Sequence, residues 1–302
     1  MKQSAFISII GVPNVGKSSL LNKLLGTKVA IISPKPQTTR TKITGVLTEG
    51  DTQLVFIDTP GFHKPKTTLG KNMVRAVGDS LGGIDGAVLV VDCTAKEIKP
   101  EEKELIRKIT KQHIKTILAL NKVDALADKE KLLTKIAAFS ALYDFEAVVP
   151  ISVLKGEKIE ELKAEIKKFA VEGPFFFPED TLTDQPERVL VSEIIREKML
   201  KLLSQEVPHG IAVSIEKMRM RDESDMMDID AVIYCERDSH KGIIIGKKGA
   251  MLKKISTEAR GDIERFFDCR INLSTWVKVK EDWRNRPGLI HNFGLDFSED
   301  TF

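Results

Sequence analysis

The sequence has few cysteines and no long apolar run. Its three cysteines are Cys93, Cys235 and Cys269. They are odd in number, far apart and without the spacing of metal ligands, so we expect buried thiols in a reducing compartment. No apolar run reaches the roughly 20 residues that span a membrane, and the N-terminus lacks the basic and then apolar pattern of a signal peptide. The sequence therefore predicts a cytosolic protein.

The chain also has little excess of charge of one sign. The net charge is +3, and neither half of the chain is strongly basic. Charge alone therefore gives no argument for nucleic-acid binding, and any RNA site must be a local patch. An apolar share of 42% and a charged share of 30% are ordinary for a globular protein. A length of 302 residues favours two domains.

The most informative stretch lies near the N-terminus and matches the pattern G-x4-G-K-[ST]. It follows an apolar run at 5–10, an expected strand, and precedes an expected helix at 19–25. In this context the pattern predicts a phosphate-binding loop, whose glycines allow close approach and whose N–H groups cradle phosphate. Lys17 would contact the β- and γ-phosphates, and Ser18 would ligate Mg²⁺. The stretch reads Gly11-Val12-Pro13-Asn14-Val15-Gly16-Lys17-Ser18.

Two further motifs follow in the order that a nucleotide site requires. The run Asp58-Thr59-Pro60-Gly61 ends an expected strand, so Asp58 suits a carboxylate that holds Mg²⁺ through water, and Gly61 suits an N–H donor to the γ-phosphate. The run Asn121-Lys122-Val123-Asp124 ends another strand. One carboxylate accepts both donors of guanine, N1–H and the 2-amino group, and would remain unpaired against adenine. Asp124 therefore predicts guanine selection.

The order of elements predicts the fold of this first part. Expected strands at 42–48, 53–57, 84–92, 116–120 and 147–151 alternate with expected helices at 100–111 and 157–170. Such alternation implies a doubly wound, mostly parallel α/β sheet that binds its ligand at the carboxyl ends of the strands. The segment Ser152-Val153-Leu154 would then offer backbone N–H groups to guanine O6.

Together these motifs resemble the GTP-binding domain of the Era and tRNA-modification GTPases. The resemblance implies a Mg²⁺-dependent GTPase in which Thr39 reaches the metal when GTP is bound, with Thr38 as the alternative. It implies a K⁺ site at Asn14, and Lys17, Thr39, Gly61 and Asn14 as the catalytic residues. The nucleotide-binding residues are then Gly11, Val12, Pro13, Asn14, Val15, Gly16, Lys17, Ser18, Ser19, Thr38, Thr39, Asp58, Thr59, Pro60, Gly61, Phe62, Asn121, Lys122, Asp124, Ser152, Val153 and Leu154.

This chain departs from the related GTPases at two places. Phe62 stands where Ras-like GTPases carry the glutamine that positions water, so something else must orient the attacking water. Ser152-Val153-Leu154 replaces the usual Ser-Ala start, which weakens the assignment of that one contact.

A second, smaller module follows a linker. We place the GTP-binding domain at 1–173, the linker at 174–186, an RNA-binding domain at 187–280 and a tail at 281–302. Three adjacent phenylalanines, 175–177, are expected to dock the linker onto one or both domains. Beyond the linker we expect a helix at 187–206, strands at 210–218 and 229–236, a helix ending near 267 and a strand at 270–279.

A G-x-x-G turn lies in this second module, within a window rich in lysine and free of acids. Two glycines let a nucleotide backbone come close, and lysines meet phosphates. The apolar run Ile243-Ile244-Ile245 is expected to floor a groove for unpaired bases. The order of elements resembles the type II KH fold. The expected RNA-binding residues are Ile245, Gly246, Lys247, Lys248, Gly249, Lys253 and Lys254.

The order of GTPase domain, aromatic linker and KH module resembles the Era family across nearly the whole chain. That resemblance implies partners in GTP and GDP, in the 3′ end of 16S rRNA and in the 30S subunit, whose maturation it assists, and none in DNA. The rival interpretation is a regulatory GTPase whose second module binds protein or the membrane surface. The expected location is the cytoplasm, with a weak peripheral association with the cytoplasmic face of the inner membrane.

Overall fold

The computed structural model describes residues 1–33, 35, 38–126 and 128–295. These residues form two compact units. The first comprises Met1–Ala30, Thr39–Lys66 and Gly70–Asp184, and the second comprises Ile31–Thr38, Thr67–Leu69 and the chain from Gln185 onward. Pro34, Pro36 and Gln37, which the sequence assigns to a loop, lie outside the described residues, as does the end of the tail.

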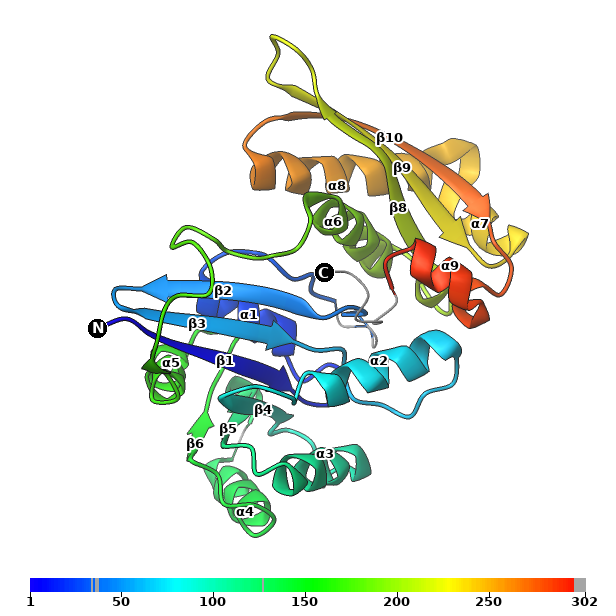
Figure 1. The fold of residues 1–302 in the computed structure, drawn as a ribbon. Coiled ribbons are helices and arrows are strands. Elements are labelled where there is room, and N and C mark those ends of the chain that lie inside the picture. Colours follow the sequence, from blue (N-terminus) through cyan, green and yellow to red (C-terminus); the bar gives the residue numbers. More distant parts are fainter. Residues whose placement is uncertain (34, 36–37, 127, 296–302) are drawn as a thin grey trace. The chain divides into compact units, whose positions relative to one another are not determined.

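The first unit is built on a sheet with strand order β2-β3-β1-β4-β5-β6, in which β7 pairs with β1 (Figure 1). All neighbours run parallel except the pairs β2–β3 and β1–β7. The predicted doubly wound, mostly parallel sheet is therefore confirmed. Its strands are β1 (Gln3–Ile10), β2 (Ile43–Glu49), β3 (Thr52–Asp58), β4 (Gly86–Asp92), β5 (Thr116–Asn121), β6 (Ala147–Pro150) and β7 (Val171–Glu172), and its helices are α1 (Lys17–Leu25), α2 (Thr68–Asp79), α3 (Pro100–Lys111), α4 (Lys129–Ser140) and α5 (Ile159–Lys167).

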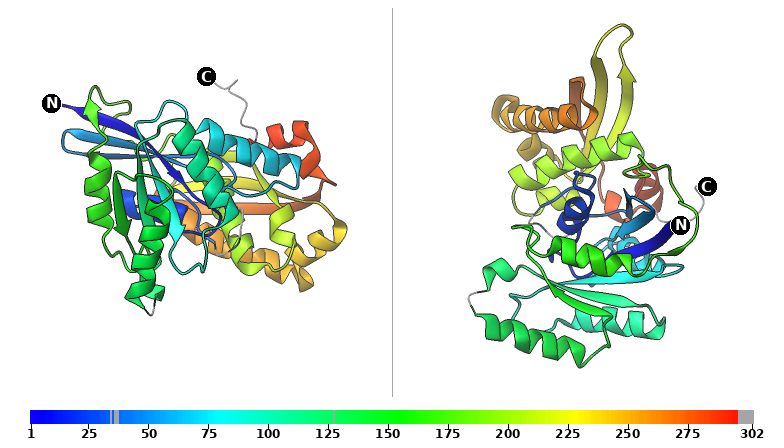
Figure 2. Two further views of the ribbon diagram at one scale, coloured as in Figure 1. Left: turned by 90° about the horizontal axis from the view of Figure 1, so that it is seen from below. Right: turned by 90° about the vertical axis from the view of Figure 1, so that its left-hand side faces the viewer.

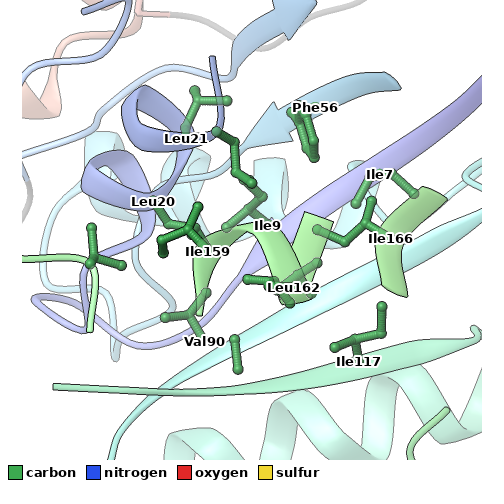
Figure 3. Close-up of a cluster of buried hydrophobic side chains, with 14 of the residues drawn as sticks. Ile7, Ile9, Leu20, Leu21, Phe56, Val90, Ile117, Ile159, Leu162 and Ile166 are labelled. Carbon is green, nitrogen blue, oxygen red and sulfur yellow. The ribbon is translucent and has the colours of Figure 1, made fainter. Parts of the chain in front are cut away.

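Both faces of this sheet are buried, because its central strands are apolar without interruption. Alternate residues point to opposite faces, so Ile7 and Ile9 of β1 pack with α1 and α5, while Ile10 packs on the side of α3 and α4. Figure 3 shows the first of these cores, with Leu20 and Leu21 of α1 meeting strand side chains. Figure 2 shows helices on both sides of the sheet.

Two helices of this unit escape prediction from the sequence. Helix α2 contains Gly70 and Gly78, which lower helix propensity, and α4 carries no clean apolar stripe, since its Leu133 is 67% exposed. The expected helix at 157–170 is shorter, because Lys158 adopts a left-handed conformation before Ile159 and the chain turns into β7 soon after the helix ends.

The linker is docked on the first unit, as the phenylalanines predict. Phe176 packs on Phe6 with ring centroids 4.6 Å apart. The fully buried Gln53 accepts hydrogen bonds from the N–H groups of Phe176 and Phe177 and donates one to Phe177 O. Farther along, Leu182 O accepts a hydrogen bond from Val46 N at 2.9 Å. The linker thereby covers the outer edge of β2, which would otherwise present unpaired backbone groups.

The second unit is a three-stranded sheet of order β10-β9-β8, with β10 parallel to β9 and β8 antiparallel to it. Helices α6, α7 and α8 pack on this sheet, and α6 and α8 lie together on one face (Figure 1). The elements are α6 (Glu187–Leu202), β8 (Ala212–Met220), β9 (Met226–Cys235), α7 (Asp238–Ile245), α8 (Ala250–Phe267), β10 (Arg270–Val279) and α9 (Pro287–Asn292).

Helix α7 corrects one expectation about the second module. The run Ile243-Ile244-Ile245 forms the last turn of this helix, which the sequence did not predict, and of the three only Ile244 is withdrawn from any groove by burial. Ile244 lies in the core, fully buried, while Ile243 is 49% exposed, as the 3.6-residue period of a helix requires. Among the described residues, no helix is long and apolar enough to cross a membrane.

Candidate nucleotide and RNA sites

The phosphate-binding loop connects β1 to α1 at the carboxyl end of the sheet. Its two motif glycines have positive φ angles, 154° at Gly11 and 103° at Gly16. A Cβ atom at Gly11 would lie 2.4 Å from Val90 O, and one at Gly16 would lie 2.3 Å from Asn121 Nδ2. No side chain fits at either position. The loop therefore keeps its backbone against β4 and β5, where its N–H groups can cradle a phosphate.

Two opposite charges are buried beside this loop. Lys17 Nζ donates to Val12 O at 3.2 Å. Burial lowers the pKa of Lys17 to about 8, an effect that the charge of Asp58 opposes. Burial raises the pKa of Asp58 to about 6, opposed by Lys17 and by hydrogen bonds from Ser18, Thr39 and Thr59. The two groups are desolvated, which is the condition under which a polyphosphate and a cation bind strongly.

Three oxygen-bearing side chains meet at the position expected for Mg²⁺. Ser18 Oγ donates to Asp58 Oδ2 at 2.6 Å and lies 2.7 Å from Thr39 Oγ1. Asp58 Oδ1 is buried and has no hydrogen-bond partner among the described residues. Hard oxygen ligands with an unused carboxylate oxygen fit Mg²⁺. Thr38 Oγ1 instead donates to Lys35 O at 2.6 Å, so Thr39 is the threonine at this cluster.

The segment after Asp58 packs against the phosphate loop. A Cβ atom at Gly61 would lie 2.7 Å from Pro13 Cα, and Phe62 N donates to Gly11 O at 3.1 Å. The ring of Phe62 is buried in the core, with Lys108 Nζ 4.5 Å from its centroid. The Phe62 side chain therefore points away from the phosphate position, and this residue contributes backbone alone.

Asn121 ties the base-reading segment to the phosphate loop. Its Nδ2 donates to Val15 O at 2.8 Å, and its Oδ1 accepts from Lys122 N and from Val153 N. One side chain thus joins three segments of the site. Because the Val153 N–H is already bonded to Asn121, it is not free to meet guanine O6 as the sequence suggests.

Asp124 is exposed, and its Oδ1 accepts a hydrogen bond of 2.5 Å from Ser152 Oγ. This contact fixes the carboxylate whose second oxygen can accept from a guanine edge. Lys122 Nζ forms an ion pair with Asp92 Oδ2 at 2.6 Å. Asp92 is absent from the sequence-based site, although its place at the end of β4, beside the end of β5, was a usable signal.

The G-x-x-G turn lies between α7 and α8 in the second unit. Gly246, Lys248 and Gly249 have positive φ angles of 72°, 51° and 79°. A Cβ atom at Gly246 would lie 2.7 Å from Met251 Cβ, whereas none of the described atoms lies within 4 Å of one at Gly249. Four of the seven predicted RNA-binding residues are exposed lysines grouped around this turn: Lys247, Lys248, Lys253 and Lys254.

Within the second unit, α6 holds the segment that precedes Thr39. Glu197 Oε1 accepts from Ile32 N at 2.9 Å, and Arg196 donates to Thr38 O. Glu193 pairs with Arg196 at 2.6 Å. Arg196 and Glu197 are almost fully buried, and Glu197 also pairs with Lys201 at 3.1 Å.

Two family models match the chain. A model described as 50S ribosome-binding GTPase matches residues 6–122, and a KH domain model matches residues 206–284. The first range contains the phosphate loop and Asn121, and the second contains the G-x-x-G turn. Neither range tests the domain limits proposed from the sequence.

Curated relatives and solved structures cover nearly the whole chain. The chain is 49% identical to GTPase Era of Clostridioides difficile (strain 630) over 98% of its length and 99% of that protein, and 48% identical to GTPase Era of Ruminiclostridium cellulolyticum over 97% of each. It superposes with a TM-score of 0.93 and 40% identity on a point variant of Aquifex aeolicus Era bound to GDP.AlF4⁻, covering 97% of this chain and 99% of that one. A structure of Era with MgGDPNP and nucleotides 1506–1542 of 16S ribosomal RNA gives a TM-score of 0.94 at 39% identity, over 98% and 100%. This chain belongs to the Era family of GTPases.

Proposed function

We propose that this GTPase binds the 3′ end of small-subunit rRNA through its KH module and assists maturation of the 30S subunit. The observation that carries the proposal is the presence, in one chain, of a complete guanine-nucleotide site and a lysine-rimmed G-x-x-G turn. The Era structure with MgGDPNP and 16S rRNA nucleotides supports it.

In this proposal each residue of the nucleotide site has a defined role. Ser18 and Thr39 ligate Mg²⁺ directly, and Asp58 holds it through water, which uses its unpaired oxygen. When bound, Mg²⁺ neutralises charge that develops on the phosphates. Lys17 contacts the β- and γ-phosphates, and the Gly61 N–H orients toward the γ-phosphate. Asp124, held by Ser152, reads the guanine edge.

We also propose that Asn14 helps to hold a K⁺ ion beside the phosphates, since Phe62 supplies no polar group there. Asn14 is exposed and has a φ angle of 65°, on the loop that would surround the phosphates. Such an ion would stabilise charge on the bridging oxygen in the transition state. Hydrolysis should be faster in KCl than in NaCl, and Asn14→Ala should remove the difference. Equal rates in both salts would reject the K⁺ site.

RNA binding is tested at the G-x-x-G lysines. Lys247→Ala and Lys248→Ala should each weaken binding of the 1506–1542 fragment and flatten its salt dependence, because each removes about one phosphate contact. GTP binding should persist in both. Gly246→Asp is a less clean variant, because any side chain there meets Met251.

Co-sedimentation with lipid vesicles distinguishes this function from the alternative, binding to a membrane surface. Co-sedimentation should recover the protein with 30S subunits and not with anionic liposomes at the same salt concentration. Recovery with liposomes alone would favour the membrane-binding interpretation.

A further inference from the structure

One large aromatic side chain of the KH module is exposed on the sheet face opposite α6 and α8. Thr275 Oγ1 lies 2.9 Å from Ser256 Oγ of α8, so Thr275 faces the helices. Neighbouring residues of a strand point to opposite faces, and Trp276 therefore lies on the other face of the sheet. Its side chain is 48% exposed, while Val232, its partner on β9, is 3% exposed. Tryptophan is enriched at binding surfaces, because its ring offers a large apolar area and its N–H a polar group.

Two lysines continue this surface along the same strand. Lys278 and Lys280 follow Trp276 at alternate positions and are exposed. The Lys280 N–H donates to Cys235 O at 2.8 Å, so the strand pairing reaches this residue. In the part of the chain that the structure describes, neither lysine forms an ion pair. We call Trp276, Lys278 and Lys280 the indole platform.

Phe293, the residue directly after α9, packs on the neighbouring strand β9 rather than on the platform. Phe293 packs on Tyr234 of β9, with ring centroids 4.8 Å apart. Tyr234 is the partner of Lys278, which nevertheless stays exposed on the edge strand β10. Phe293 therefore packs on β9 beside the platform, and Lys278 remains exposed.

Two acidic groups of the same face, Asp228 and Asp230, lie toward the other end of the strands, whereas Glu236 lies at the lysine end and is paired with Arg284 at 2.5 Å. Asp228 is paired with Arg221 at 2.7 Å and also accepts from Asn272 Nδ2. Asp230 stands opposite Ser274, on the side of the indole away from the lysines. The platform therefore combines an apolar aromatic surface with positive charge, which complements a nucleotide strand, with its bases and phosphates.

We propose that the indole platform binds a single-stranded stretch of the RNA that the G-x-x-G turn holds. This inference rests on the proposed RNA-binding function. Strand β10 is an edge strand that contacts α7 and α8 and carries Trp276 on the face away from α8. A G-x-x-G loop holds about four nucleotides, so longer RNA must leave it. RNA that crosses the free edge of β10 reaches the platform, where a base stacks on the indole and phosphates meet Lys278 and Lys280.

The chain offers a direct optical test, because it contains two tryptophans. Trp283 is fully buried, with its indole N–H bonded to Gly210 O at 2.9 Å. Stacking on Trp276 should therefore quench the exposed component of the fluorescence. The probes are the RNA of nucleotides 1506–1542 and an RNA tetranucleotide from its 3′ end. We expect quenching by the long RNA, little by the tetranucleotide, and none in Trp276→Phe.

Affinity measurements complete the test. Trp276→Ala should weaken binding of the long RNA by about fivefold to a hundredfold, the effect of losing one stacked base. Trp276→Phe should recover part of that affinity, and Lys278→Ala with Lys280→Ala should flatten the salt dependence. GTP hydrolysis and the melting temperature of Trp276→Ala serve as fold controls.

The outcomes separate the two proposals. If Lys247→Ala and Lys248→Ala weaken RNA binding while Trp276→Ala changes neither affinity nor fluorescence quenching, the KH function stands and the platform is rejected. If the wild-type chain does not bind the long RNA at all, both are rejected. Loss of affinity in Trp276→Ala without quenching in the wild type also rejects stacking.

Discussion

At the scale of single residues, the base-reading pair Asp124 and Ser152 gives the sharpest prediction. Asp124→Asn replaces an acceptor by a donor, which suits the 2-oxo group of xanthine better than the 2-amino group of guanine. Affinity should move from GTP to XTP, which a nucleotide competition assay measures. Ser152→Ala is the matched control, since it removes the 2.5 Å contact that positions the carboxylate. Ser152→Ala should lower the affinity for GTP several-fold without raising the affinity for XTP. Unchanged GTP affinity in Asp124→Asn would refute the assignment.

Glu102 gives a prediction about stability and pH. It is 1% exposed, its Oε2 accepts from Lys99 N at 2.8 Å, and its Oε1 has no partner among the described residues. Burial raises its pKa. A raised folded-state pKa gives stability that is present at low pH and is lost as pH rises through that value. Glu102→Gln keeps the capping acceptor without the charge. The variant should gain stability relative to the wild type as pH rises from about 4, the ordinary pKa of a glutamate, toward neutrality.

Thermal unfolding of both proteins across that range checks this effect. A Glu104→Gln control, at an exposed position on the same helix, should show no such pH dependence. If the Glu102 variant is less stable than the wild type at neutral pH, the buried carboxylate is stabilising and the argument is wrong.

The residues of the nucleotide site show which parts of a site can be predicted from the sequence. The loop glycines, Asp58, Asn121 and Asp124 were predictable because each motif needs that residue type at that spacing. The contacts Ser152–Asp124 and Asp92–Lys122 were not, because they join side chains from different strand ends. The assignment of Thr39 over Thr38 also required coordinates, since neighbouring hydroxyls are equivalent until the backbone orients them.

At the scale of elements, the docked linker is the part that can be tested most directly. Gln53→Leu would leave the Phe176 and Phe177 N–H groups and the Phe177 carbonyl without their partner. Each unpaired group costs about 1–3 kcal/mol when buried, so we expect destabilisation of about 3 kcal/mol and faster proteolytic cleavage in the linker. Limited proteolysis and thermal unfolding measure the two effects.

Glu179→Ala is the control within the same linker. It removes an exposed ion pair with Lys2, which contributes little, so cleavage and stability should stay near wild type. Equal cleavage of Gln53→Leu and the wild type would show that the linker is held by its phenylalanine rings alone.

Element types were easier to predict than element limits. Strands with continuous apolar runs, such as β4 and β5, are recognisable because both sheet faces are buried. Helix α2 was not predicted, because its glycines lower helix propensity although Leu69, Met73 and Val77 recur at helical spacing, and α4 was not, because exposed apolar residues blur its period. Helix α7 was not predicted, because a three-residue apolar run is too short to show a helical period.

At the scale of the whole molecule, adjacent residues Thr38 and Thr39 cluster with different units. Thr39 lies at the metal cluster, and Thr38 belongs to the segment that α6 holds. If Mg²⁺ and the γ-phosphate pull Thr39 toward them, the adjoining segment that ends at Thr38 can transmit the nucleotide state to the KH module. RNA affinity should then differ between a non-hydrolysable GTP analogue and GDP by about 5- to 150-fold.

The measurement compares RNA affinity with the analogue, with GDP and without nucleotide. Glu197→Gln, which weakens the bond to Ile32 N, should reduce the difference while leaving RNA binding itself intact. Equal affinities in all three states would leave an RNA-binding GTPase whose two activities are uncoupled.

The path of the linker has a consequence for synthesis on the ribosome. The edge of β2 is completed by Leu182, and β1 receives β7 and the Gly173 N–H only near the end of the unit. A nascent chain leaves the ribosome with its N-terminus first, at about 5–20 residues per second. Strand β2 must therefore wait many seconds with an open edge before the covering segment leaves the exit tunnel. An unpaired strand edge favours aggregation, so a gene truncated before the codon for Leu182 should yield an aggregation-prone product.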